Sequence, residues 1–268
     1  LTIAGSAAFG RRVGLGAAAA EVTLTRTLAA RLGAGITLDA YAQRPPSGDV
    51  GTTRGVRVHA HAKDDLRTAA AAGAGSEKLA VAASAAMTTV DSHVDAEIGA
   101  NARVNQGTRL AHGATQSVQV QAEHVGDLLG VGGGLAIGGS VGIGAAIDAE
   151  SVTRHVGASV GAGAAVSAAN AITVSADAKF DVLSVTATAA VAFSGAGTGV
   201  AADGSVGVLL HGADVLAQVG SGAQLVAGDD VTVSAGSALG LLSVSAGVAG
   251  GRSAGFAVSG GMVVYDNS

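Results

Sequence analysis

The feature that most constrains this sequence is a repeat of about 60 residues, which two independent patterns mark. The first pattern alternates apolar and polar residues around a central valine, at Val58, Val120, Val174 and Val233. The spacings between these valines are 120−58 = 62, 174−120 = 54 and 233−174 = 59. Such a period is typical of architectures in which each unit packs mainly against its neighbours.

A second pattern has a matching period. It runs in the segments 32–38, 98–104, 156–162 and 219–225, so that its starts are separated by 98−32 = 66, 156−98 = 58 and 219−156 = 63 residues. Compositional bias alone does not place two patterns at matching intervals. The chain therefore contains roughly four and a half degenerate units.

Both patterns predict β-strands, because apolar residues occupy every second position, which is the period of a half-buried strand. We expect one set of side chains to be buried, namely Val118, Val120, Ile172, Val174, Val231 and Val233. The alternate residues Gln119, Thr173 and Thr232 should face outward. Glycine and aspartate in 220–222 and 227–230 predict turns between strands. The best helical candidate, Asp64–Ala86, is disfavoured by its central Gly73 and Gly75.

These elements predict an all-β fold, a parallel β-solenoid built from the 60-residue repeats. We expect about three rungs of about 20 residues in each repeat, so that about 13 rungs would form a rod about 60–65 Å long. Residues 1–42 would be a first partial repeat, residues 43–55 a polar loop containing Pro45 and Pro46, and residues 56–268 the remaining units of one continuous solenoid. A linker between domains is the alternative interpretation of the proline segment.

The apolar content depends on small side chains. The chain has 43 glycines and only 2 % aromatic residues, and alanine and valine supply most of its 49 % hydrophobic content. Such residues favour thin, closely approaching layers. We expect the closest approach of facing sheets in the segments 69–86, 130–147, 187–207 and 247–261. The apolar run 128–147 is long enough for a membrane helix, but its glycines argue against one.

Charge and cysteine content exclude several classes of function. Without cysteine, the chain has no disulfide, no thiol nucleophile and no cysteine-ligated zinc. A net charge of −5 argues against nucleic acid as a partner. The first residues, Leu1–Gly5, lack a methionine and a basic segment, so we interpret the sequence as an excised fragment.

The segments 222–235 and 241–251 resemble a known family, the large filamentous exoproteins of Gram-negative bacteria, which include filamentous-haemagglutinin-like adhesins and leukotoxin-like repeat proteins. The resemblance covers most of the chain and is weakest before Val56. It implies a β-helical shaft, export through an outer-membrane transporter and an extracellular or cell-surface location. It also implies a role in attachment, aggregation or biofilm, with host or bacterial cell surfaces and matrix glycans or proteins as partners.

Two histidines are the best candidates for metal ligands. His59 and His61 lie two residues apart on one strand and could present two imidazoles to one metal ion. The alternation instead places both on the solvent face with Arg57 and Lys63, whose positive charges disfavour a cation. We interpret them as an exposed pair.

Candidate catalytic carboxylates are equally weak. Asp64–Asp65 and Asp229–Asp230 are paired, as a polysaccharide lyase or hydrolase would need, but Asp229–Asp230 fits a turn before a strand. The remaining acids, such as Asp95, Glu97 and Asp148, are scattered without a repeated cluster. There is no tryptophan to stack on a sugar, and Tyr41 and Tyr265 are the only tyrosines. We therefore predict no catalytic, cofactor-binding or metal-binding residue, no cofactor and no enzymatic activity.

The leading hypothesis is a structural shaft module of a secreted filamentous adhesin. A self-assembling extracellular fibre subunit is the alternative, because no capping helix is evident in the sequence and uncapped strands favour end-to-end self-association. A polysaccharide lyase or hydrolase on a β-helix is the least favoured hypothesis.

Overall fold

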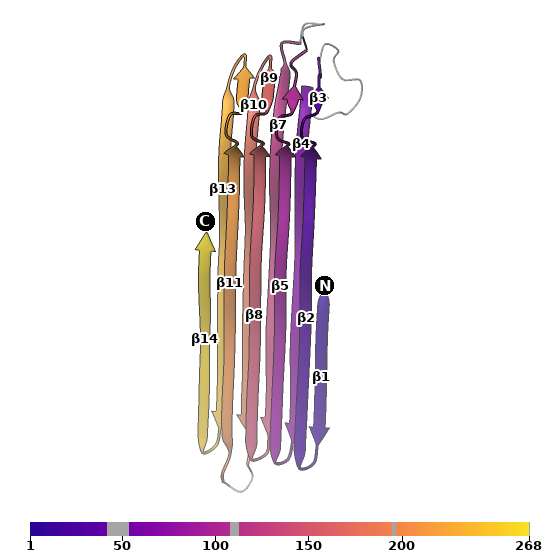
Figure 1. The fold of residues 1–268 in the computed structure, drawn as a ribbon. Helices are drawn as coiled ribbons and strands as arrows, with labels where there is room; N and C mark the ends of the chain where they lie inside the picture. Colours follow the sequence, from indigo (N-terminus) through magenta and orange to yellow (C-terminus); the bar gives the residue numbers. More distant parts are fainter. Residues whose placement is uncertain (42–53, 108–112, 195–196, 268) are drawn as a thin grey trace.

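The computed structural model describes residues 1–41, 54–107, 113–194 and 197–267, and these form an all-β parallel solenoid (Figure 1). The rear sheet of Figure 1 contains β1 (Thr2–Gly10), β4 (Arg54–Ser76), β7 (Gln116–Gly138), β10 (Ile172–Ala192) and β13 (Val231–Gly251). The front sheet contains β2 (Val13–Leu32), β5 (Leu79–Ile98), β8 (Val141–Val160), β11 (Val200–Val219) and β14 (Ala254–Asn267). A short sheet contains β3 (Thr37–Leu38), β6 (Arg103–Val104), β9 (Ala165–Ala168) and β12 (Gln224–Ala227).

Each coil follows the same path. A long strand runs down the rear sheet, a tight turn leads into a long strand that returns up the front sheet, and a second turn leads into the short sheet. The repeated valines lie directly side by side in the rear sheet, because Val120 pairs with Val58 on one side and Val174 on the other, and Val174 pairs with Val233. The 60-residue period is therefore the length of one coil.

The prediction of three rungs in each repeat is wrong, because each repeat forms a single coil. The long strands of the complete coils have 20–23 residues, because the glycine-rich stretches continue the strands and do not end them. Gly130, Gly132 and Gly134 lie within β7 and have no positive φ. A strand of 20 residues is about 66 Å long, whereas five stacked strands span only about 24 Å. The long axis of the molecule thus lies along the strands and not along the direction in which the coils stack (Figure 1).

One turn recurs at the upper end of the front sheet. Its left-handed position is occupied by Gly35, Asn101, Gly163 and Gly222, with φ between 56° and 71°. Glycine and asparagine tolerate this conformation best among the L-residues. The predicted turn at 220–222 is confirmed, and so is the turn between β12 and β13 at 228–230.

The predicted inward and outward alternation is confirmed in the inner coils. Val118, Val120, Ile172 and Val174 are fully buried, and Gln119 and Thr173 lie on the outer face, partly exposed. Val231 and Val233 of the terminal coil are 46 % and 45 % exposed, although they are in register with Ile172 and Val174. They point to the same side as the buried residues, and the described residues include no coil beyond β13 and β14 to cover them.

The two long sheets approach most closely in their lower halves, as the small residues predict. A Cβ added to Gly14 or Gly16 of β2 would collide with a backbone carbonyl of β4, at Gly75 or Gly73. Gly142 of β8 has the same relationship to Val191 of β10. Alanines of both sheets, including Ala80, Ala82, Ala136, Ala190 and Ala201, fill the remaining space.

The apolar run 128–147 forms the end of β7, a two-residue turn and the start of β8. Within the described residues, no helix is long and apolar enough to cross a membrane. Most of the predicted proline loop, residues 43–53, lies outside the described residues, and its last two residues, Arg54 and Gly55, begin β4.

Candidate functional site

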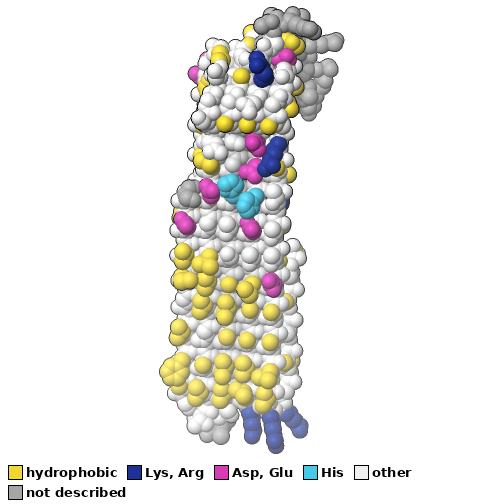
Figure 2. Space-filling view, in the orientation of Figure 1, with side chains coloured by type: hydrophobic (Ala, Val, Ile, Leu, Met, Phe, Trp, Pro, Cys, Tyr) yellow, Lys and Arg dark blue, Asp and Glu magenta, His cyan; other side chains and the backbone are white. Residues whose placement is uncertain are grey.

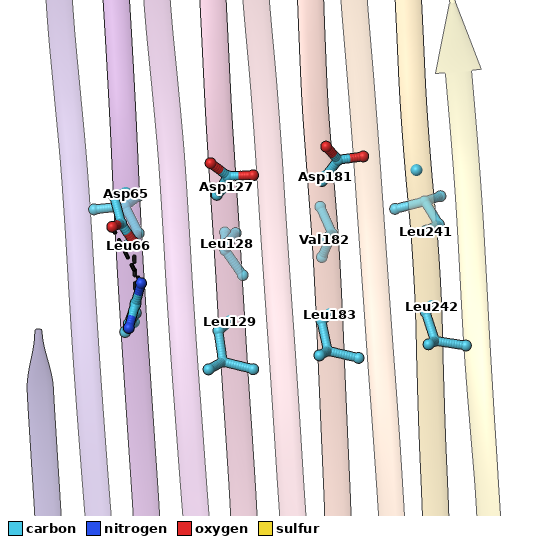
Figure 3. A pocket seen from close by; sticks show the side chains of 12 residues that line it. Asp65, Leu66, Asp127, Leu128, Leu129, Asp181, Val182, Leu183, Leu241 and Leu242 are labelled. Atoms are coloured by element: carbon cyan, nitrogen blue, oxygen red, sulfur yellow. Dashed lines mark hydrogen bonds and ion pairs between the residues drawn. The ribbon is translucent and has the colours of Figure 1, made fainter.

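A row of carboxylates crosses the outer face of the rear sheet. Asp65, Asp127 and Asp181 occupy paired positions of β4, β7 and β10, and Gly240 takes this position in β13. Two residues further along each strand, the adjacent row of outward-facing side chains contains Arg67 and three leucines, Leu129, Leu183 and Leu242. Figure 3 shows the two rows side by side, along an open groove of about 600 Å³. We call them the aspartate row (Asp65, Asp127, Asp181) and the leucine row (Leu129, Leu183, Leu242).

The sequence analysis missed the aspartate row, although a signal was available. Each of its members lies seven residues after a repeated valine, since 58+7 = 65, 120+7 = 127 and 174+7 = 181. Alignment of the repeats on these valines would have found it. The sequence analysis considered pairs of adjacent acids instead. Neighbouring residues of a strand point to opposite faces, so that such pairs do not share one surface.

Positive groups balance the aspartate row only in part. Arg67 donates hydrogen bonds to both carboxylate oxygens of Asp65, at 3.1 and 3.3 Å. Lys63 and Lys179 lie in the row above, separated by Val125. In-register strands are about 4.8 Å apart, so that neighbouring carboxylates repel one another unless a donor or cation binds to them. The groove can therefore accept hydrogen bonds beside an apolar strip.

The groove contains no hydroxyl nucleophile paired with a histidine base. Its lining consists of aspartate, arginine, glycine, valine and leucine, without a serine, threonine or histidine. No group of three or more His, Cys, Asp or Glu residues could hold a metal ion in the described part of the chain.

His59 and His61 lie on the outer face of the rear sheet with Arg57 and Lys63, as predicted. Their rings stack with centroids 5.9 Å apart, and Glu123 of β7 lies 3.9 Å from His59 Nε2 and 4.0 Å from His61 Nε2. Burial and the positive charge of Arg57 lower the pKa of His59.

The front sheet has a second His/Asp cluster on its outer face, which the sequence analysis did not identify. His155 Nδ1 lies 2.8 Å from Asp214 Oδ2, and its Nε2 lies 3.8 Å from Asp95 Oδ1. The rings of His155 and His93 are 5.6 Å apart, and His93 lies 3.5 Å from Asp91. Glu97, also predicted as an isolated acid, forms an exposed ion pair with Arg31 at 3.5 Å.

Below this cluster, the outer face of the front sheet is apolar (Figure 2). Among its described residues, Glu21 is the only charged one between the levels of Val13 and Thr23. The exposed side chains of this apolar face include Val13, Leu15, Met87, Ile143, Ile147, Val206 and Leu210. Five strands over 10 residues cover about 24 by 33 Å, or about 800 Å². Exposed apolar areas above a few hundred Å² mark interaction sites on soluble proteins.

The acidic pair Asp64–Asp65 is divided between the two faces of β4. Asp65 points outward, whereas Asp64 is buried and accepts hydrogen bonds from Arg26 at 2.8 and 2.9 Å. The Nε2 atom of His124 lies 2.8 Å from the same carboxylate. Burial alone would raise the pKa of Asp64, but the His124 hydrogen bond and the Arg26 charge outweigh it and hold that pKa below its ordinary value.

A second polar cluster lies between the sheets. Arg154 is almost fully buried, places its guanidinium 4.8 Å from the ring centre of Phe180 and contacts His211 Nε2 at 2.7 Å. Burial lowers the pKa of Arg154 to about 10. Burial and the charge of Arg154 lower the pKa of His211 to about 4, so that this imidazole is neutral near pH 7.

The other predicted acids have different environments. Asp229 and Asp230 are exposed in the turn before β13, as predicted. Asp148, expected to be one of the scattered acids, is completely buried between the sheets on β8.

Comparison with protein-family models, curated proteins and solved structures gave no match.

Proposed function

We propose that this chain is a structural shaft module of a secreted filamentous adhesin, which contacts cell surfaces or matrix through repeated rows on its outer faces. The observation that carries the proposal is the aspartate row beside the leucine row, in which equivalent side chains occupy the same position in successive coils. Such rows offer several weak contacts in a fixed spacing, and linked weak contacts raise the effective affinity by orders of magnitude.

The chemistry of the groove favours hydroxyl- or amide-bearing polymers. Carboxylates accept hydrogen bonds from the hydroxyl groups of glycans and from the amide groups of peptides, while the leucine row provides an apolar strip. The resemblance of segments 222–235 and 241–251 to filamentous exoproteins supports a cell-surface location and export through an outer-membrane transporter.

The proposal is tested by adhesion of beads coated with the chain to bacterial cells, host cells and immobilised matrix glycans. We expect Asp65→Asn, Asp127→Asn and Asp181→Asn together to reduce bead retention at least tenfold. The matched control carries Asp91→Asn, Asp95→Asn and Asp214→Asn on the outer face of the front sheet. Equal retention of both triple variants and the wild type on every surface would refute a binding role for the aspartate row.

A self-assembling fibre subunit is the second candidate, because the coils stack through parallel strands that pair in register, a contact that a coil of a second chain could also make. Unpaired strand edges pair readily with other strands. Sedimentation velocity separates the two candidates. Fibre subunits assemble into longer fibres as the concentration rises, so that the sedimentation coefficient increases, whereas a shaft module keeps one sedimentation coefficient.

A further inference from the structure

Two acidic side chains are buried side by side between the sheets. Asp148 and Glu150 are 0 % and 2 % exposed and occupy successive inward positions of β8. Gly130 of β7 faces them. A Cβ added to Gly130 would collide with both carboxylate oxygens of Asp148 and with Oε1 of Glu150. The two carboxyl groups therefore converge on the space that the missing side chain of Gly130 leaves.

Most of the oxygens of this pair have no hydrogen-bond partner. Ser184 donates a hydrogen bond to Asp148 Oδ2 at 2.5 Å. Asp148 Oδ1 and both oxygens of Glu150 are buried without a partner in the structure. A buried polar atom without a partner is costly, and such atoms in a folded protein often indicate a bound water or ion.

Hydroxyl groups surround the same space. Thr68 and Ser184 flank Gly130 in the rear sheet, and Thr88 lies beside Glu150 in the front sheet. The hydroxyls of Thr68 and Thr88 are 2.7 Å apart across the two sheets. Four strands, β4, β5, β8 and β10, thus contribute side-chain oxygen atoms to one enclosed region.

No described side chain supplies a neutralising positive charge. Arg154 lies on the same face of β8, but Val152 separates it from Glu150, and its guanidinium contacts His211 and Phe180. Burial raises the pKa of Asp148 to about 6. Burial and the charge of Asp148 raise the pKa of Glu150 to about 9. The pair therefore requires either a retained proton or a cation.

We propose that Asp148 and Glu150 form a buried binding site for one Ca²⁺ ion, lined further by the hydroxyl groups of Thr68, Thr88 and Ser184. The donor set contains only oxygen, which selects hard cations over zinc or copper. Two carboxylates match the charge of a divalent ion. They also provide four oxygens, to which three hydroxyl oxygens are added, and Ca²⁺ takes six to eight. The ion would join the two sheets in the middle coils.

The test measures bound metal in the chain purified from millimolar calcium and dialysed against calcium-free buffer. Inductively coupled plasma mass spectrometry should find one Ca²⁺ per chain, and the melting temperature should fall when the metal is removed with EGTA. Asp148→Asn with Glu150→Gln should lose both the ion and the response to EGTA. Glu150→Gln alone repeats the measurement if the double variant does not fold.

Two controls separate this site from other acids. Asp203→Asn changes another buried carboxylate, one bound by Thr188, and should leave the ion in place. The triple asparagine variant of the aspartate row should also keep it. The proposal is overturned if the wild type retains no calcium and melts identically with and without EGTA, since the pair would then hold a proton. Loss of the ion only from the aspartate-row variant would overturn it equally.

Discussion

The carboxylate of Asp64 accepts two hydrogen bonds from the guanidinium of Arg26, which lies 38 residues earlier in the chain. Asp64 belongs to β4 of the rear sheet and Arg26 to β2 of the front sheet, so that the pair connects the two sheets and joins the first coil to the second. Arg26 also donates to Ser92 at 3.2 Å. Arg26 is partly exposed, whereas Asp64 is buried.

Replacing Arg26 with alanine should therefore destabilise the fold strongly. The variant leaves the Asp64 carboxylate buried with only His124 beside it. Removing one partner of a buried pair costs about 3–5 kcal/mol, and the partial exposure of Arg26 reduces our expectation to about 2–3 kcal/mol. Urea denaturation measures the change. Arg31→Ala, which breaks the exposed pair with Glu97, is the control and should cost less than about 1 kcal/mol. Equal costs for the two variants would contradict this account.

The alternation of β10 can be tested at two neighbouring residues. Val174→Asp places a charge without a partner in the dry core and should lower the free energy of unfolding by about 3–5 kcal/mol. Thr173→Asp, one position earlier on the outer face, should cost less than about 1 kcal/mol. The comparison uses urea denaturation near pH 7. A similar loss of stability at both positions would show that the strand does not have one buried and one solvent-facing side.

His211 should make the fold sensitive to acid. Its pKa is about 4 in the folded state and 6.5 in the unfolded chain, so that the unfolded chain binds the extra proton between these values. The stability that the neutral imidazole contributes to the fold is fully present above pH 6.5 and is lost as the pH falls towards 4. His211→Gln retains an acceptor for Arg154 but does not titrate. We expect the variant to show a smaller loss of urea midpoint between pH 6.5 and 4 than the wild type, and parallel curves would contradict the assignment.

The recurring upper turn predicts different responses at two glycines. Gly222 has φ of 71° and open space around it, so that Gly222→Val should cost about 1–2 kcal/mol through backbone strain alone. Gly222→Asn should cost less, since Asn101 already adopts this conformation with φ of 56°. Gly212 in β11 also has open space but no positive φ, and Gly212→Ala should not destabilise the chain. The melting temperatures of the three variants are compared by thermal unfolding. An unchanged melting temperature for Gly222→Val would contradict the predicted backbone strain at this turn.

Several properties of this protein follow from the sequence alone. The 60-residue period, the all-β solenoid and the burial of Val118, Val120, Ile172 and Val174 follow from patterns that lie within single strands or recur along the chain. Alternation with period two is a local property, because successive side chains of a strand point to opposite faces in any sheet. The solvent-facing positions of His59 and His61 were predicted for the same reason.

Only the tertiary structure decided how many coils a repeat makes and which buried groups meet. Glycine serves two purposes here, a positive φ at Gly222 and a close approach of the sheets at Gly16 or Gly142, and the sequence does not distinguish them. Dividing the 60-residue period into three rungs of about 20 residues predicted short strands, whereas the chain forms strands of 20–23 residues. The convergence of Asp148 and Glu150 on Gly130, and the contact of Arg26 with Asp64, likewise depend on which strands of the two sheets face each other. That alignment is set by the packing of small side chains between the sheets, which no local pattern records.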